Sequence, residues 1–308
     1  MGEDKGGGEH GMFPPIPTFP HKGGRDYLRG LRDQMSFFWW KEKRLRTVWR
    51  VEKDGKTSFL VGTAHFFPYS FRKALTKLIQ NVETVLFEGP LDQESMERVV
   101  QYGHQGENRP SISEVLDPAA IKEINRQLSS RVTGNTTAGS YLQFIHPESS
   151  DFLEVHTRGV RPWLAFFTVW SAFLDWKYSM DLEAFRIAQE FGKTIQYLET
   201  LEDQLAALDG IPFERFVRYL NRIGNWKKHK EMFLKAFLAG DLEKFVSMTG
   251  EFPTRCESIL AKRDPIFFKG IKASFEKEET AAFIGAAHIP GIRKMFLEEG
   301  YRVTQEES

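Results

Sequence analysis

The sequence has very little cysteine and no excess of charge. Its 308 residues include a single cysteine, Cys256, so no disulfide can form within the chain, and a reducing, cytoplasmic compartment is expected. Lysine plus arginine and aspartate plus glutamate both number 42, which gives a formal net charge of zero. Without an excess of basic residues, nothing in the composition indicates a nucleic-acid partner.

Long apolar runs and the commonest catalytic motifs are also missing. The longest apolar run, residues 163–176, is shorter than the ~20 residues that cross a bilayer. It contains Asp175, so the segment from Arg161 to Tyr178 predicts a buried helix, and neither a transmembrane segment nor a signal peptide is expected. P-loop, GxSxG and HExxH motifs do not occur, and the one GxGxxG match, residues 6–11, follows no predicted strand, which argues against several common enzyme classes.

The stretch from Phe59 to Pro90 carries the clearest structural signal. It contains an apolar run that ends at Gly62, a segment with apolar residues at helical spacing, and a second apolar run. This order predicts a right-handed β-α-β unit whose two strands form a parallel pair. His65 follows the first strand and Glu88 ends the second. An imidazole and a carboxylate are therefore expected at the carboxyl edge of a parallel sheet, where ligands gather.

The same pattern returns near the C-terminus, at residues 281–305. An apolar run is again followed by Gly-x-x-His, a helical segment and a short β-like run, with Gly285 and His288 in the corresponding places. This internal similarity suggests two related halves. A further predicted strand, residues 194–200, ends on Glu199. Four apolar runs thus bring two histidines and two glutamates to one edge of the sheet.

These elements predict an α/β fold in which pseudo-symmetric βαβ halves form a mostly parallel central sheet. A large helical insertion, at about residues 93–193 and 200–279, is expected to cover the carboxyl edge and shape a pocket. Residues 1–25 are rich in glycine and proline and are expected to form a disordered tail, with residues 26–308 as one domain. The aromatic residues 37–40 are expected to pack on the edge of that domain.

The two histidines and two glutamates form the candidate site. A lone Gly-x-x-His motif favours a local hydrogen bond for its histidine, but two copies in similar settings favour a shared function. A carboxylate after a buried strand is costly unless it is paired, protonated or metal-bound. Glu88 and Glu199 are therefore either metal-site residues or partners in a helix cap or in a salt bridge with Arg161 or Arg263. Imidazole and carboxylate together are typical of a divalent metal site.

The remaining reactive side chains are assigned ordinary structural roles. Cys256 lies in a helical pattern without a nearby histidine, which argues against a nucleophile. Asp181 is interpreted as a cap of the helix predicted at residues 179–193. Four further histidines are expected at the surface: His104, His146, His156 and His229.

From about Trp49 onward, the sequence resembles the TraB/GumN family and the related Tiki proteins. The resemblance is carried by FLVGTAHF, VLFEGP, MDLEAFRIAQEFGKTIQYLETLEDQ, AKRDPIF, and AAFIGAAHIPGI with GYRV following. Neither the C-terminal membrane segments of the TraB branch nor the export signal common in GumN and Tiki proteins is expected from this sequence. Its acidic strand ends in Glu-Gly-Pro, where the family usually has Glu-Leu-Asp.

The resemblance implies both a fold and an activity. The fold is the pseudo-symmetric α/β fold of a superfamily that includes erythromycin esterase-like and haem-binding ChaN-like proteins. For the Tiki branch, the activity is a metal-dependent, peptidase-like one with Mn or Co as the metal. Carried over by motif, the functional positions are His65, Glu88 and His288, with Glu199, Gln204 and Arg263 as further family-pattern residues.

The leading hypothesis is a metal-dependent hydrolase that acts on a peptide or small amide. His65, Glu88 and His288 are predicted to bind the ion, with Mn or Co favoured and Zn or Fe as alternatives. The predicted catalytic residues are Glu88 as ligand or general base, Glu199 as the group that orients a ligand or water, and Arg263 as a stabiliser of negative charge or an anchor. A homodimer is compatible with this hypothesis. The alternatives are a non-catalytic protein that binds haem or a peptide, and a structural regulator whose site has lapsed.

Overall fold

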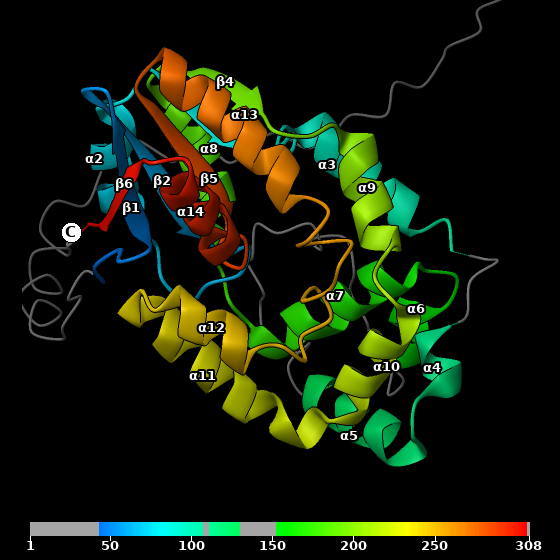
Figure 1. Ribbon diagram of the computed structural model, residues 1–308. Coiled ribbons are helices and arrows are strands. Elements are labelled where there is room, and N and C mark those ends of the chain that lie inside the picture. Colours follow the sequence, from blue (N-terminus) through cyan, green and yellow to red (C-terminus); the bar gives the residue numbers. More distant parts are fainter. Residues whose placement is uncertain (1–42, 107–110, 130–151, 307–308) are drawn as a thin grey trace, which may run out of the picture. The chain divides into compact units, whose positions relative to one another are not determined.

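The computed structural model describes residues 43–106, 111–129 and 152–306 (Figure 1). All of them belong to one compact unit that begins at Lys43. The tail predicted for residues 1–25 and the aromatic residues 37–40 lie outside the described residues.

A six-stranded sheet forms the centre of this unit, with the strand order β4-β3-β5-β2-β1-β6. Strands β4, β3, β5 and β2 run parallel to one another, whereas β1 is antiparallel to both β2 and β6. The predicted α/β class with a mostly parallel sheet is therefore confirmed. The strands are β1 (Val48–Lys53), β2 (Lys56–Thr63), β3 (Thr84–Phe87), β4 (Thr194–Tyr197), β5 (Thr280–Gly285) and β6 (Arg302–Gln305).

Strand β5 lies between β2 and β3 and pairs with both. Thr63 is opposite Gly285 in the β2–β5 register, and Phe87 is opposite Phe283 in the β3–β5 register. The expectation that β2 and β3 pair directly was wrong, because β5, from the C-terminal part of the chain, is inserted between them. As a consequence, the two strands that precede His65 and His288 are direct neighbours.

Helices cover both faces of the sheet (Figure 1). Helices α13 and α14 pack against each other on one face, and α2 and α8 pack against each other on the opposite face. The strands between them contribute fully buried side chains to the core, such as Val61, Val85 and Phe283. The bounds of these helices are α2 (Arg72–Gln80), α8 (Met180–Glu190), α13 (Asp264–Lys277) and α14 (Ile289–Glu298).

The other helices lie mainly on the side of the carboxyl edge of the parallel strands, as predicted for the insertion (Figure 1). Many of them share a second hydrophobic cluster, in which Phe166, Trp170 and Trp226 are buried. These elements are α3 (Gln93–Gly103), α4 (Ile112–Val115), α5 (Pro118–Ser129), α6 (Phe152–Thr157), α7 (Pro162–Leu174), α9 (Leu201–Asp209), α10 (Phe213–Asn221), η1 (Ile223–Asn225), α11 (Trp226–Ala239) and α12 (Leu242–Met248).

Two helix predictions need correction. The strongly apolar helix α7 is buried as expected, but it ends at Leu174 because Asp175 adopts a left-handed conformation with φ of 51°. Residues 251–263, expected to be largely helical, form a series of turns that contains Cys256. Within the described residues, no helix is long and apolar enough to cross a membrane.

Candidate functional site

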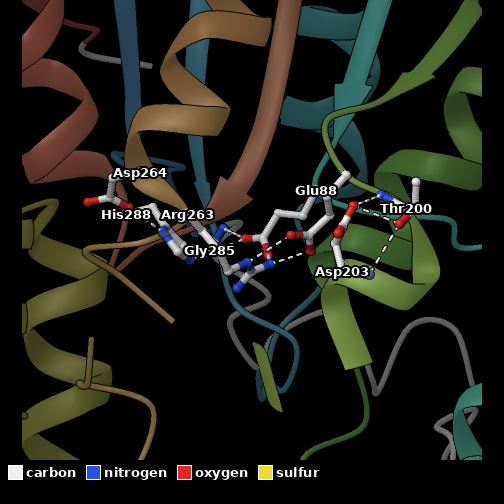
Figure 2. A network of polar contacts seen from close by, with 8 residues as sticks. Glu88, Thr200, Asp203, Arg263, Asp264, Gly285 and His288 are labelled. Carbon is white, nitrogen blue, oxygen red and sulfur yellow. Dashed lines mark hydrogen bonds and ion pairs between the residues drawn. The ribbon is translucent and has the colours of Figure 1, made fainter. Parts of the chain in front are cut away.

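The residues after four parallel strands meet at the carboxyl edge of the sheet. Across that edge, Glu199 follows β4, Glu88 follows β3, His288 follows β5 and His65 follows β2. The two glutamates are linked through the backbone as well, because the Glu199 N–H donates to the Glu88 carbonyl at 2.9 Å. Thr200, the next residue, caps α9 and fixes the point at which the chain leaves the edge (Figure 2).

Arg263 joins the two glutamates (Figure 2). Its Nη2 donates to Glu88 Oε2 at 2.8 Å and to Glu199 Oε1 at 2.6 Å, and its Nε donates to Glu199 Oε2 at 2.9 Å. The side chains of Glu88, Arg263 and Glu199 are only 11%, 10% and 4% exposed. Of the interpretations of Glu199 open from the sequence, the structure thus shows the salt bridge with Arg263. Glu88 binds the same arginine.

The two glutamates differ in their protonation behaviour. Burial raises the pKa of Glu88, but the charges of Arg263, His288 and His65 outweigh burial and lower that pKa to about 2. For Glu199, burial dominates and its pKa is raised in spite of the bonds from Arg263. The shared guanidinium therefore favours the ionised form of Glu88 strongly, whereas burial makes Glu199 easier to protonate than a free glutamate.

In the second Gly-x-x-His motif, Gly285 lies against Glu88. Its N–H donates to Glu88 Oε1 at 2.5 Å, and a Cβ at this position would lie 3.1 Å from that oxygen. Gly62, in the first motif, has a different role, because a Cβ there would lie 2.8 Å from a methyl carbon of Leu242. The glycine of the second motif therefore makes room for a site residue, whereas that of the first makes room for packing.

Gln204 packs beside Gly89, the residue that follows Glu88. A Cβ at Gly89, the residue after Glu88, would lie 3.2 Å from the Nε2 of Gln204. The structure thus brings this family-pattern residue to the segment that leaves β3 directly after Glu88.

His288 is buried and held by a carboxylate. Its Nδ1 lies 2.6 Å from Oδ1 of Asp264, and its side chain is 4% exposed (Figure 2). Its other ring nitrogen, Nε2, lies 3.9 Å from Glu88 Oε1. Asp264 directly follows Arg263 and is the first residue of α13, so the start of one helix contacts both the glutamate pair and the histidine.

His65 also has a carboxylate at Nδ1, but its ring is open to solvent. Nδ1 lies 2.9 Å from Oδ2 of Asp181, and the two side chains are 60% and 6% exposed. The ring N–H is not aligned with this oxygen, which has no hydrogen bond within the described residues. Desolvation is the largest single influence and lowers the pKa of His65, but the charges of Asp181 and Glu88 together outweigh it and raise this pKa to about 9.

The comparisons with known proteins identify the family of this chain. The sequence model of the TraB/PrgY/gumN family matches residues 47–305, which is most of the chain. The chain belongs to the TraB/PrgY/gumN family. The family resemblance predicted from the sequence motifs is thereby confirmed. A search of the curated proteins found no match.

Two aspartates of this TraB/PrgY/gumN protein escaped the sequence interpretation. Asp181 was expected to cap its helix, but the cap is Ser179, whose side chain accepts from the Leu182 N–H, and Asp181 contacts His65 instead. Asp264 belongs to the AKRDPIF motif, but no role was expected for it. The available signals were the position of Asp181 in the first turn of the helix predicted at residues 179–193 and the position of Asp264 directly after Arg263.

A divalent metal ion fits these residues by donor type. Both histidines have a carboxylate at Nδ1, the setting that is typical of metal-bound histidine, and Glu88 adds an ionised carboxylate. In addition, Asp181 Oδ2 is a buried oxygen without a hydrogen-bond donor among the described residues. The described part of the chain holds no group of three or more histidine, cysteine, aspartate or glutamate side chains already arranged around one ion. The donors are thus suited to a metal but not gathered at a single point.

The other histidines lie away from these motifs. His104 is exposed and caps the C-terminal end of α3, as expected, but His156 was wrongly placed at the surface, because it is a buried residue of α6, 5% exposed. His229 is partly buried, with Nδ1 3.2 Å from the Tyr219 hydroxyl. His146 lies outside the described residues.

Proposed function

We propose that this TraB/PrgY/gumN protein is a hydrolase of peptide or small amide bonds that uses a divalent metal ion, Mn or Co before Zn or Fe. One observation carries the proposal. His65 and His288 leave neighbouring parallel strands, and each has a carboxylate within 2.9 Å of Nδ1. This arrangement leaves Nε2 of both rings as the atom that can bind an ion.

Three side chains would hold the ion: His65 and His288 through Nε2, and Glu88 through its carboxylate. A bound ion of this type would polarise a scissile carbonyl and supply hydroxide near neutral pH. The solvent-exposed His65 ring gives the site an open side through which a substrate can approach. The choice of a peptide or amide substrate is supported by the resemblance to the Tiki branch.

Glu88 is better suited to be a ligand than a general base. A general base is most effective when its pKa lies near the working pH, and the pKa of Glu88 is about 2. Its position is fixed on both oxygens, by the Gly285 N–H and by Arg263. Such a carboxylate keeps its negative charge and its orientation, which are the properties that a ligand to a hard or borderline cation needs.

Glu199 is the better candidate to accept a proton from an attacking water. Its pKa is raised, so it lies closer to neutral pH than that of Glu88. Arg263 holds both carboxylates at fixed positions, and its single positive charge leaves the pair one net negative charge for an ion to neutralise. Arg263 thus acts as an anchor of the site in this proposal.

The test measures bound metal and turnover together. The full chain, purified without a histidine tag, is analysed for metal content, then stripped with a chelator and reloaded with Mn²⁺ or Co²⁺. Turnover is followed on a panel of fluorogenic peptides. His65→Ala and His288→Ala are each expected to lose metal, whereas the exposed control His104→Ala keeps both metal and turnover.

Two outcomes contradict the proposal. Metal content and turnover that stay unchanged in both histidine variants would remove these residues from any metal site. A wild-type chain that binds haem, seen as a Soret band, and cleaves no peptide would favour the non-catalytic binding protein instead.

A further inference from the structure

The two halves of the site share a feature beyond the Gly-x-x-His motif. In each half, the helix that follows the histidine packs against a second helix, and the first turn of that second helix carries an aspartate. His65 is followed by α2, which packs against α8, and Asp181 is the second residue of α8. His288 is followed by α14, which packs against α13, and Asp264 is the first residue of α13.

This correspondence is spatial and does not follow chain order. Asp181 comes after its histidine in the sequence, whereas Asp264 comes before its histidine. The pairs α2–α8 and α13–α14 lie on opposite faces of the sheet (Figure 1). One imidazole is therefore held from each face, and both lie at the carboxyl edge of the neighbouring strands β2 and β5.

We propose that Asp181 and Asp264 are equivalent positioning residues, each of which holds Nδ1 of its histidine so that both rings present Nε2 to one shared ligand. Neither aspartate needs to touch that ligand. The proposal rests on the proposed function only in taking the shared ligand to be a metal ion.

The placement of both aspartates suits them to hold an imidazole. Each lies in the first turn of an α-helix, where the helix dipole favours a negative charge. Their side chains are 6% and 14% exposed, so water competes little for the histidine nitrogen. Gly291, in the first turn of α14, makes room for Asp264, because a Cβ at that position would collide with its carboxylate.

A carboxylate at Nδ1 also selects the tautomer of a neutral imidazole. An acceptor next to Nδ1 stabilises the Nδ1–H form, which leaves the lone pair on Nε2. For His288 the geometry is complete, with 2.6 Å between Nδ1 and Asp264 Oδ1. For His65, Nδ1 lies 2.9 Å from Asp181 Oδ2, but the N–H does not point at this oxygen. The negative charge of Asp181, more than a hydrogen bond, therefore favours the Nδ1–H form of His65.

The decisive measurement is made on the metal-free chain. Long-range ¹H–¹⁵N correlation spectra with ¹⁵N-labelled histidine show which ring nitrogen carries the proton. The neutral form of His288 is expected to carry it on Nδ1 in the wild type and to become a mixture of tautomers in Asp264→Ala. The spectrum of His65 is recorded at about pH 10, above its pKa of about 9, with Asp181→Ala as the variant.

Matched controls come from the same two helices. Glu183, in α8, binds the hydroxyl of Ser70, and Glu276, in α13, accepts a hydrogen bond from the Tyr301 hydroxyl. Glu183→Gln and Glu276→Gln remove a bonded carboxylate without touching either histidine and are expected to leave both tautomers unchanged. Asp264→Asn, which keeps the side-chain shape, replaces Asp264→Ala if the alanine variant does not fold.

A second readout is the affinity for Mn²⁺, measured by calorimetry. Loss of a partner that orients a metal-bound histidine typically weakens binding by about 10–100-fold, and this loss is expected for Asp181→Ala and Asp264→Ala. A neutral His288 with its proton on Nε2 in the wild type would overturn the proposal without any variant. So would folded aspartate variants with unchanged tautomers. If the wild type binds no Mn²⁺ and cleaves no peptide, the proposed function fails, while the metal-free spectra still decide the role of the aspartates.

Discussion

Arg263 and Asp264 are neighbours in the chain but serve different partners in the site. The guanidinium of Arg263 holds Glu88 and Glu199, and the carboxylate of Asp264 lies 2.6 Å from Nδ1 of His288. Both residues stand at the start of α13, which packs against the sheet. The position of this helix end therefore fixes the carboxylate pair and one imidazole together.

The first prediction is that Arg263→Met destabilises the protein strongly. The substitution leaves two carboxylates without their cation, both at least 89% buried as side chains. Breaking a buried ion pair from one side typically costs about 3–5 kcal/mol in the free energy of unfolding. Urea unfolding at pH 7 measures the loss.

Arg222→Met is the matched control, because Arg222 forms an ion pair with Glu251 on the surface, where solvent screens the interaction. We expect little change in the free energy of unfolding for this variant. Equal losses in the two variants would show that the Arg263 cluster contributes no more to stability than a surface pair.

The second prediction concerns the acid side of the stability curve. The pKa of Glu88 is lowered from 4.5 to about 2, so its ionised form is favoured in the folded state. A group of this kind adds stability above pH 4.5, and the contribution is lost as the pH falls through 2. The change in the pKa of Glu88 corresponds to a contribution on the order of 3 kcal/mol to the free energy of unfolding.

Glu199, whose pKa is raised, changes the stability in the opposite direction as the pH falls. Comparison of the wild type with Glu88→Gln separates the contribution of Glu88 from that of Glu199. The difference in unfolding free energy between wild type and variant should shrink between pH 4.5 and pH 2, measured by urea unfolding at each pH. A difference that stays constant over this range would mean that Glu88 has an ordinary pKa.

The positions of the candidate residues were predictable because they depend on local patterns. An apolar run followed by a glycine or a reactive side chain marks the end of a strand, and parallel strands share a carboxyl edge. His65, Glu88, Glu199 and His288 were placed at that edge on this basis, and the structure has them there.

What the sequence could not supply depends on long-range packing. The insertion of β5 between β2 and β3 joins segments from opposite ends of the chain, and no local pattern encodes that order. The contacts of Asp181 and Asp264 likewise depend on how α8 and α13 pack beside the sheet. The sequence marks Asp181 only as an ordinary cap residue, and the start of α13 at Asp264 was hidden because residues 251–263 were expected to be helical.

The third prediction is that Gly285→Ala disturbs the site. The added Cβ would lie 3.1 Å from Glu88 Oε1, so the carboxylate must move and its bond from the Gly285 N–H weakens. Overpacking of this kind typically costs about 1–3 kcal/mol, and we expect a lower melting temperature together with weaker Mn²⁺ binding. Gly250→Ala is the control, because its Cβ would make an ordinary contact at 3.7 Å. If Gly285→Ala behaves like the control, the space at Gly285 is not needed by Glu88.

The last prediction separates the roles of the two glutamates. In Glu88→Gln the amide is a poorer donor to a hard or borderline cation than the carboxylate, so metal content should fall, and turnover with it. In Glu199→Gln the metal ligands stay in place, so metal content should persist while turnover falls by about 10²–10⁴-fold, the usual contribution of positioned proton transfer. Metal per chain and the cleavage rate of the best fluorogenic peptide are measured on the same samples.

The reverse pattern, with metal kept in Glu88→Gln and lost in Glu199→Gln, would exchange the two assignments. A full rate in Glu199→Gln would remove the proton-acceptor role, because the raised pKa of Glu199 would then reflect its burial alone.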